Sequence, residues 1–178
     1  MAEVTVTDYD PRWPELYRQE AARLEAALGD NLVRMFHMGS TSVPGLRAKP
    51  VIDIMGLVWD LKKVEDCRPA FEELGYKVLG ECGIPGRRYM RRGGDGTPRT
   101  HHVHLYQFDD SRNILKDIAF REFLRCHPEQ AAAYGALKTR LAREFPEDYM
   151  GYCRGKEKFV EQLSKQALAW FWREFPEK

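Results

Sequence analysis

The spacing of apolar residues predicts a sheet in the first two-thirds of the chain and helices in the last third. One set recurs at helical spacing up to the stop at Gly29. Its members are Trp13, Leu16, Tyr17, Leu24 and Leu28. Two mostly apolar runs, 32–38 and 51–59, are typical of strands, and the second suits a strand buried on both faces. Only Asp53 and Gly56 interrupt it.

Downstream, the pattern predicts one more helix before the sheet is complete. Asp60 is a suitable N-cap for a helix that Gly75 ends. Strands are then expected at 76–79, 87–92 and 100–108, with a glycine-rich turn before the last, and helical periodicity follows at 112–126, 128–145 and 156–173. We therefore expect an α/β (α+β) fold in one domain, 1–178, sheet-rich over 1–108 and helical over 109–178.

Composition excludes several classes of protein. The 178 residues are 43% hydrophobic, which rules out wholesale disorder, and 28 Lys+Arg against 27 Asp+Glu exclude an extended polyanion-binding surface. No apolar run is long enough for a bilayer, and residues 1–20 carry charges where a signal peptide needs apolar residues. The four cysteines form no CxxC pair, so neither a zinc ribbon nor a disulfide framework is expected. We expect a cytoplasmic protein with no membrane partner; the sequence indicates no oligomeric state.

The segment 36–54, FHMGSTSVPGLRAKPVIDI, carries the first candidate chemistry. Gly39 and Ser40 follow a predicted strand, where backbone N–H groups and a small hydroxyl can hold a phosphate oxygen. Asp53 is isolated among apolar residues, an expensive position unless the carboxylate is paired or bound to a metal. The alternative is an Asp that caps a loop or pairs with an arginine. Lys49 either meets a phosphate or Asp53, or is solvated surface.

Three histidines in four residues form the second candidate. His102 and His104 share one face of a strand and His101 takes the other. With Asp53 on a neighbouring strand, they would complete a site for a divalent ion, Mg, Mn or Zn. The alternative is surface histidines on an edge strand.

Residues 87–99 hold five arginines and one acid, Asp95. Arg87 and Arg88 point to opposite faces of a strand, so one face can meet a phosphate while the other is solvated, unless the whole segment is a solvated hairpin edge. Helical candidates for further cations are Arg121, Arg125, Lys138 and Lys156. A local cluster with one interleaved aromatic, Tyr89, favours a small phosphorylated ligand over a long nucleic acid.

These segments resemble the GrpB family from about residue 5 to about residue 165. The motifs are HMGSTSVPGLRAKPVIDIM, GIPGRRYM, HVH, IAFREFLRCHPE, the Y…LK of the following helix, and GYCRGKEKF. The resemblance implies a nucleotidyltransferase-like mixed sheet flanked by helices, with Gly39-Ser40 matching the Gly-Ser element and Asp53 the first metal-binding acid. Members also resemble a domain fused to dephospho-CoA kinase. Two residues after the first acid, where the superfamily usually has a second metal-binding acid, this sequence has Met55. Asp60 lies too far along the chain to replace it.

The leading hypothesis is a protein that binds a nucleotide or a coenzyme A-like molecule and catalyses metal-assisted nucleotidyl transfer. Gly39, Ser40 and Thr41 would hold phosphate oxygens, with Lys49, Arg87, Arg88 and Arg121 neutralising charge. Ser40 and Asp53 would be catalytic, and Asp53, His102 and His104 would hold the ion. The alternatives are a catalytically silent nucleotide-binding module and a metal-dependent phosphohydrolase.

Overall fold

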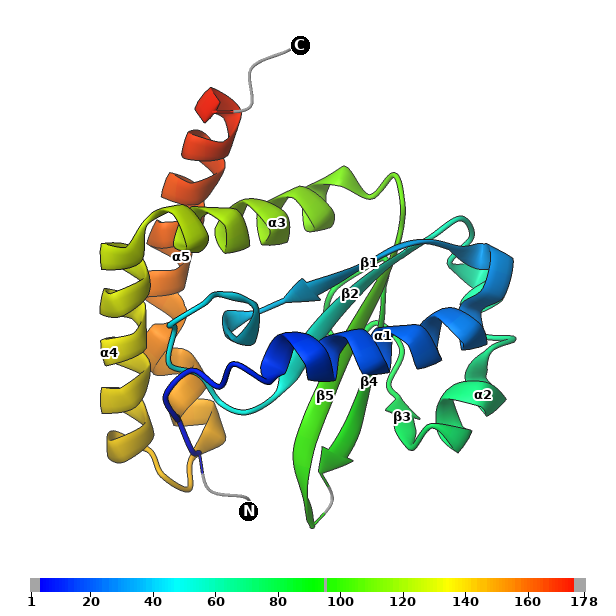
Figure 1. Ribbon diagram of the computed structural model, residues 1–178, viewed down its shortest axis with the longest axis horizontal. Coiled ribbons are helices and arrows are strands. Elements are labelled where there is room, and N and C mark those ends of the chain that lie inside the picture. Colours follow the sequence, from blue (N-terminus) through cyan, green and yellow to red (C-terminus); the bar gives the residue numbers. More distant parts are fainter. Residues whose placement is uncertain (1–3, 95, 175–178) are drawn as a thin grey trace.

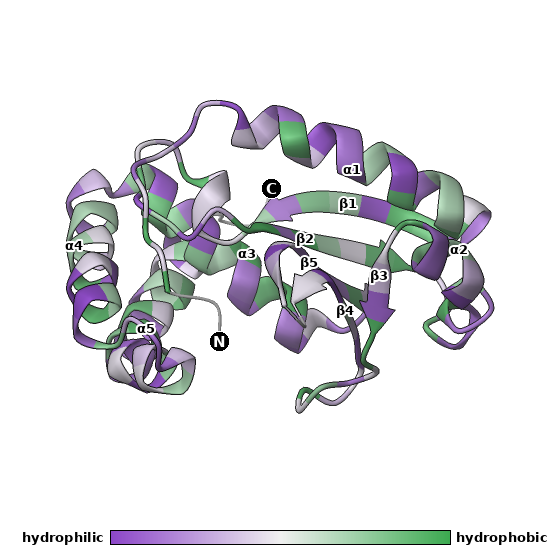
Figure 2. Ribbon diagram, turned by 90° about the horizontal axis from the view of Figure 1, so that it is seen from below, coloured by the Kyte–Doolittle hydropathy of each residue, from purple (hydrophilic) through white to green (hydrophobic). Residues whose placement is uncertain are grey.

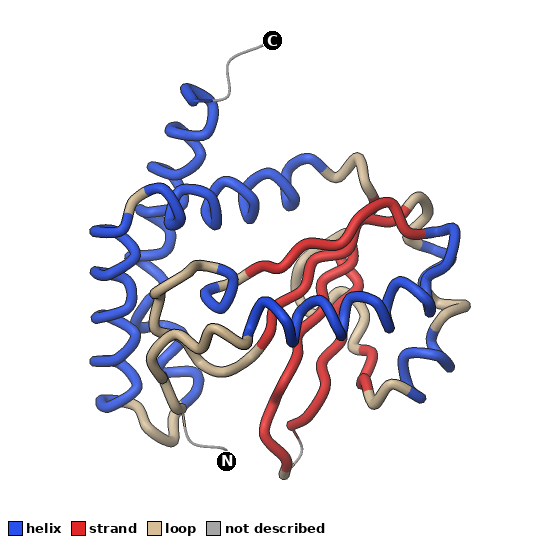
Figure 3. The backbone as a smooth tube through the Cα atoms, in the orientation of Figure 1, coloured by secondary structure: helices blue, strands red, loops and turns tan. Residues whose placement is uncertain are grey.

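A mixed five-stranded sheet forms the centre of the molecule, in the order β1-β2-β5-β4-β3 (Figures 1 and 3). The computed structural model describes residues 4–94 and 96–174, so Asp95 lies outside the described residues. The β2–β5 pair is parallel and the other three pairs are antiparallel. The strands are β1 (Leu32–Met38), β2 (Ile52–Val58), β3 (Tyr76–Val78), β4 (Arg87–Gly94) and β5 (Thr97–Gln107).

Helices cover both faces of the sheet and one of its ends. In Figure 2, α1 and α2 lie on one face, and α4 and α5 stand together beside the sheet. Helix α3 packs on the opposite face, where Ile114 joins Met38, Met55 and Tyr106 in a small core. The helices are α1 (Trp13–Leu28), α2 (Arg68–Glu73), α3 (Ser111–Cys126), α4 (Pro128–Glu144) and α5 (Tyr149–Glu174).

Alternation along β2 gives the sheet two different faces. Ile52 and Ile54 point toward α1 and are almost fully buried in the largest core, with Val103 of β5. Asp53 and Met55 point the other way, toward α3 and the C-terminal helices. A strand with apolar side chains on one face and a carboxylate on the other therefore separates the main core from the polar side.

Local signals explain where the elements begin and end. Pro14 lies in the first turn of α1, and Gly29 ends that helix with φ +52°. Asp110 caps α3 by accepting a hydrogen bond from the backbone N–H of Asn113. Between β1 and β2, Ser40–Ser42 forms one turn of 3-10 helix, η2.

The expected architecture of a mixed sheet with a helical C-terminal third is confirmed, with three local corrections. The helix expected after Asp60 is a 3-10 turn (Lys62–Val64) followed by the short α2. Helix α5 begins at Tyr149, well before the predicted 156. Of the apolar residues grouped at helical spacing, Trp13, Leu24 and Leu28 are buried as expected, whereas Leu16 is exposed.

Among residues 4–94 and 96–174, every helix is too short or too polar to cross a bilayer.

Candidate active site

The parallel pairing of β2 with β5 brings the two sequence candidates together. Its register places Asp53 beside His102 and Met55 beside His104. Nδ1 of His102 lies 3.2 Å from Oδ1 of Asp53, and the Asp53 side chain is 31% exposed. Burial alone would raise the pKa of Asp53, but the hydrogen bond from His102 and the neighbouring charges hold it below its ordinary value. Because β5 is the central strand, the alternative of edge-strand surface histidines is wrong.

Gly39 is required by the position of the Asp53 carboxylate. Its φ of +64° is unfavourable for any residue with a Cβ, and a Cβ built there would overlap Oδ2 of Asp53. The Asp53 carboxylate therefore lies against Gly39, the residue between the end of β1 and the start of η2. This contact links the Gly-Ser element physically to Asp53.

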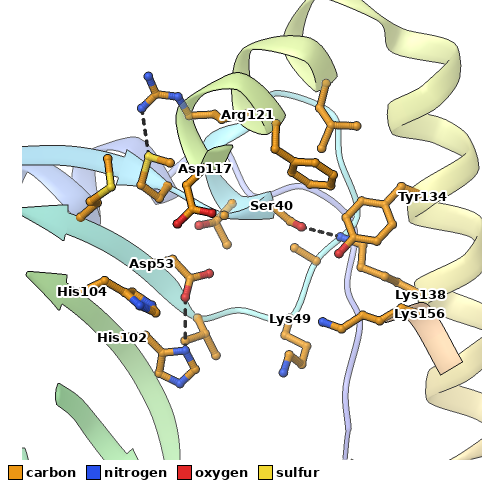
Figure 4. A pocket seen from close by; sticks show the side chains of 18 of the residues that line it. Ser40, Lys49, Asp53, His102, His104, Asp117, Arg121, Tyr134, Lys138 and Lys156 are labelled. Atoms are coloured by element: carbon orange, nitrogen blue, oxygen red, sulfur yellow. Dashed lines mark hydrogen bonds and ion pairs between the residues drawn. The ribbon is translucent and has the colours of Figure 1, made fainter. Parts of the chain in front are cut away.

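A cavity of about 300 Å³ opens in front of these residues (Figure 4). Its walls come from the β1–β2 connection, from β2 and β5, and from α3, α4 and α5. The acids and imidazoles that line it are Asp53, His102, His104 and Asp117. The basic groups that line it are Lys49, Arg121, Lys138 and Lys156.

Three lysines of the cavity are held by aromatic rings instead of carboxylates. Nζ of Lys49 lies 4.4 Å from the ring centre of Tyr149, and Nζ of Lys138 lies 4.5 Å from that of Tyr134. Lys156 lies 5.1 Å above the ring of Tyr152. Within the described ranges, no carboxylate is in ion-pair distance of any of the three. A ring face attracts an ammonium group without neutralising it, so the cluster keeps its positive charge.

The mutual repulsion of these lysines shows in their pKa values. Burial and the charges of Lys156 and Lys49 lower the pKa of Lys138 to about 7, although Asp53 acts in the opposite direction. Burial and the charge of Lys156 lower the pKa of Lys49 to about 8. A bound anion would relieve this repulsion, and the cluster is therefore suited to phosphate oxygens.

Arg87 determines which nitrogen of His104 carries a proton. Its buried guanidinium donates to the carbonyl oxygens of Glu81 and Cys82, and its Nη1 lies 3.2 Å from Nδ1 of His104. A guanidinium only donates, so Nδ1 accepts and the proton of the neutral ring is on Nε2. Burial, followed by the charge of Arg87, keeps the pKa of His104 down at about 4 against the opposing effect of Asp53. His104 is thus a neutral donor beside Asp53.

The three predicted metal ligands do not assemble into a ligand set. Nδ1 of His104 is taken by Arg87, and its Nε2 carries a proton, whereas a metal requires an unprotonated nitrogen. In the part of the chain that the structure describes, no three His, Cys, Asp or Glu side chains group as metal ligands. A divalent ion at this site stays a prediction from the sequence.

The remaining sequence candidates lie at different distances from the cavity. Ser40 lines it and receives a 2.8 Å hydrogen bond from Lys138, while Thr41 lines it with its hydroxyl 3.0 Å from Nε2 of His37. Arg121 lines it too, but its guanidinium binds the His37 carbonyl and Glu122. Arg88 is not brought to the cavity, because alternation turns it to the other face, where it pairs with Glu65.

Asp117 and the tyrosines are the functional groups that sequence reasoning missed. Asp117 enters from α3 on the same face as Ile114 and Arg121, at positions i, i+3 and i+7. Burial raises its pKa to about 6, with a further contribution from Asp53. A carboxylate between Ile114 and Arg121, a residue already considered as a site cation, on one helix face was the available signal. Asp117 is a carboxylate in the same cavity as Asp53, although it is not on the same strand.

Comparisons with known proteins agree on one family. The model of the family described as GrpB protein matches residues 3–166. The UPF0157 protein YqkA of Bacillus subtilis is 35% identical over 167 residues, and the UPF0157 protein PA4798 of Pseudomonas aeruginosa is 36% identical over 168. These matches cover 94% and 93% of this chain but 48% and 68% of the relatives. The chain therefore spans about half the length of YqkA.

A third relative has a functional name. A dephospho-CoA kinase of Mycolicibacterium paratuberculosis is 24% identical over 194 residues, a match covering 95% of this chain and 47% of that protein. Among solved structures, the GrpB protein of Enterococcus faecalis superposes with a TM-score of 0.91 and 43% identity, covering 94% of this chain and 99% of that one. Terminal uridylyl transferase 4 of Trypanosoma brucei, solved with bound UPU, matches at TM-score 0.50 and 16% identity, covering 85% and 52%. The second likeness shows a nucleotidyltransferase-like fold and nothing finer.

Proposed function

The chain belongs to the GrpB family, and from that premise we propose that it binds a phosphate-bearing small molecule, such as a nucleotide, in the cavity between the sheet and α3–α5. The observation that carries this proposal is the trio of lysines, Lys49, Lys138 and Lys156, which converge on one cavity without carboxylate partners in the described residues. Positive charge on buried amines that have no carboxylate partner is costly unless an anion meets it.

The geometry suits a chain of phosphates better than a single one. The lysines come from the loop before β2, from α4 and from α5, so they approach from separate walls. Ser40, at the start of η2, adds a hydroxyl between them. Charge-assisted hydrogen bonds to phosphate oxygens are stronger than neutral ones, and several of them fix orientation as well as affinity.

The finer proposal is nucleotidyl transfer. Phosphates on the lysines would lie next to the wall that holds Asp53, His102 and His104. There, the Nε2–H of His104 donates to an oxygen on which negative charge develops, and Asp53 accepts a proton or holds His102. Preorganised donors of this kind lower the barrier because they need no rearrangement during reaction.

Thermal unfolding with nucleoside triphosphates, inorganic tripolyphosphate and coenzyme A tests the binding proposal. A ligand at about 100 times its Kd stabilises the folded state by about 2.7 kcal/mol. We expect tripolyphosphate and at least one nucleotide to raise Tm, and Lys49→Met with Lys156→Met to remove that rise. Lys158→Met, an exposed lysine two residues from Lys156, is the matched control and should keep it. If no phosphate compound stabilises the wild-type chain, the proposal is wrong.

A second candidate is a binding module that has no turnover. Met55, fully buried, occupies the place of the second acid, and Asp117 reaches the cavity from a helix instead. Release of pyrophosphate from the stabilising nucleotide distinguishes the two. Turnover lost in Asp53→Asn, with folding retained, supports the enzyme; binding without turnover supports the module.

A further inference from the structure

Ser40 and Lys138 form a hydrogen-bonded pair on the wall of the cavity. Nζ of Lys138 lies 2.8 Å from Oγ of Ser40, although the residues are 98 positions apart in the sequence. Lys138 is only 2% exposed, whereas Ser40 is half-buried and faces the cavity. Figure 4 shows the pair bridging from η2 to α4, with Tyr134 beside it. The hydroxyl is therefore accessible to a ligand, and its amine partner is not.

The surroundings of Lys138 favour the neutral amine. Lys49 and Lys156 face it from the loop before β2 and from α5, and both oppose its positive charge. Asp53, facing it from β2, acts the other way, and Tyr134 on its own helix offers a ring and a hydroxyl. Burial and these lysines lower the pKa of Lys138 to about 7, so a substantial fraction is unprotonated at neutral pH. A neutral amine can accept a proton from a hydroxyl at 2.8 Å.

We propose that Ser40 is a nucleophile toward phosphate esters and anhydrides, with Lys138 as its general base. The pairing of a serine with a base within hydrogen-bond reach is the geometric signature of an activated hydroxyl, and lysine serves as that base in Ser–Lys pairs. The inference rests on the proposed function, because the lysines are what would bring a phosphorus atom to Ser40. It adds a covalent step that phosphate binding alone does not require.

With a nucleoside triphosphate, the covalent step exchanges one bond at phosphorus for another. Oγ of Ser40 attacks the α-phosphorus and forms an O–P bond while its proton passes to Nζ of the neutral Lys138. The bond from phosphorus to the bridging oxygen breaks, and pyrophosphate leaves with the electron pair. Lys49 and Lys156 compensate the charge that develops on the leaving phosphates. Lys138 then returns the proton to water or to the leaving group.

Ser42 provides an internal comparison. It lies two residues away on the same turn, but its Oγ donates a 2.6 Å hydrogen bond to the carbonyl oxygen of Gly39. It is buried, and in the part of the chain that the structure describes no lysine hydrogen-bonds its hydroxyl. A reagent that modified any accessible hydroxyl would label Ser40 whether or not Lys138 is present. The proposed mechanism predicts that labelling depends on Lys138.

The experiment uses a fluorophosphonate probe on the full chain, with intact-mass and peptide mass spectrometry. The expected result is one adduct, on Ser40, in which an O–P bond replaces the P–F bond and fluoride leaves. Ser40→Ala should abolish labelling and Ser42→Ala should keep it. Lys138→Met should slow labelling at least about 100-fold, the lower range of general-base contributions. In the wild type, the labelling rate should rise through a pH near 7 and then level off.

Each outcome decides the inference. No adduct on Ser40, or a labelling rate unchanged in Lys138→Met, overturns it. Circular dichroism of every variant shows whether a lost adduct is only lost folding, and Lys138→Arg, which keeps a donor but not a base, provides a second variant. Thermal shift with tripolyphosphate runs in parallel. Phosphate binding without labelling refutes the nucleophile and leaves the proposed function standing. Labelling of Ser40 without phosphate binding refutes the proposed function and leaves the nucleophile standing.

Discussion

The two faces of the sheet treat buried charge in opposite ways. On the α1 face, Glu20 is buried, and its carboxylate accepts hydrogen bonds from Arg92 at 2.8 Å and from the hydroxyl of Tyr76 at 2.9 Å. On the α3–α5 face, Lys138 is buried to the same degree, and its neighbours are a serine, a tyrosine ring and two further lysines.

The charges on the two faces of the sheet differ in whether the chain itself supplies their partners. Paired ions such as Glu20 and Arg92 are complete within the chain and connect α1 to β4. The lysine cluster is incomplete within the described residues, so its electrostatic cost is recovered only when something else supplies the negative charge. The paired ions of the core and the proposed anion-binding site therefore lie on opposite faces of the sheet.

Removing the charge of Glu20 should produce the largest loss of stability. Glu20→Gln leaves Arg92 without a counter-ion in a mostly buried setting, and breaking such a pair costs about 3 kcal/mol. Chemical denaturation of the purified variant measures the change. Glu25→Gln, the same substitution at an exposed position of α1, should cost less than about 0.5 kcal/mol. Equal effects at both positions would mean that the pair is not a structural element.

Replacing Gly39 should disturb the other face. In Gly39→Ala, the new methyl group overlaps the Asp53 carboxylate at a φ of +64°, and we expect a cost of about 2–3 kcal/mol. Gly45→Ala has a similar φ, +78°, and open space around the new atom, so about 1 kcal/mol is expected. The stability lost in Gly39→Ala beyond that lost in Gly45→Ala, measured by denaturation, reports the contact with Asp53. Identical costs would show that this contact is unimportant.

Lys138→Met should leave the unliganded protein at least as stable at neutral pH, in contrast to Glu20→Gln. The folded-state pKa of Lys138, about 7, is below its unfolded value, so above pH 7 the unfolded chain binds more protons. Stability of the wild type therefore rises with pH, by about 1.4 kcal/mol per unit at most for this group between pH 7 and 9. The variant should show a flatter profile in denaturation series. A slope equal to that of the wild type would mean that Lys138 does not lose its proton in this range.

The smallest expected effect concerns the rings beneath the lysines. Tyr149→Leu removes the face that holds Lys49, a contribution of about 0.5–1 kcal/mol, which is a two- to five-fold weaker Kd for tripolyphosphate. Tyr149→Phe keeps the ring and should keep the affinity. Isothermal titration calorimetry resolves a change of this size. If both variants bind alike, Lys49 is held by something other than the ring.

Strand alternation predicted much of the site, and helix faces predicted little of it. Period-two alternation assigned His102 and His104 to one face of their strand. That this strand lies beside the strand of Asp53 was only a condition of the prediction, and the pairing of β2 with β5 meets it. The same alternation separated Arg87 from Arg88 correctly but did not say which face meets the cavity, since that depends on where α3–α5 pack.

The start of α5 was missed for a related reason. In its first two turns, Tyr149 and Tyr152 line the polar cavity as well as packing in a small core, so the apolar periodicity is weak there. Asp117 was missed because a single acid among apolar positions on a helix is usually at its rim. Both errors fall at the cavity, where the side chains form a polar surface and the apolar pattern of a packed core is interrupted.

The separation of Ser40 from Lys138 along the chain also bears on folding. The serine and Asp53 belong to the first third of the sequence, while two of the three lysines lie on the last two helices. Helices α4 and α5 are synthesised after the strands of the sheet and α3. The residues of the acid and imidazole wall, on β2, β5 and α3, therefore leave the ribosome before the lysines of α4 and α5. Repulsion among all three lysines requires that α4 and α5 are docked beside the sheet.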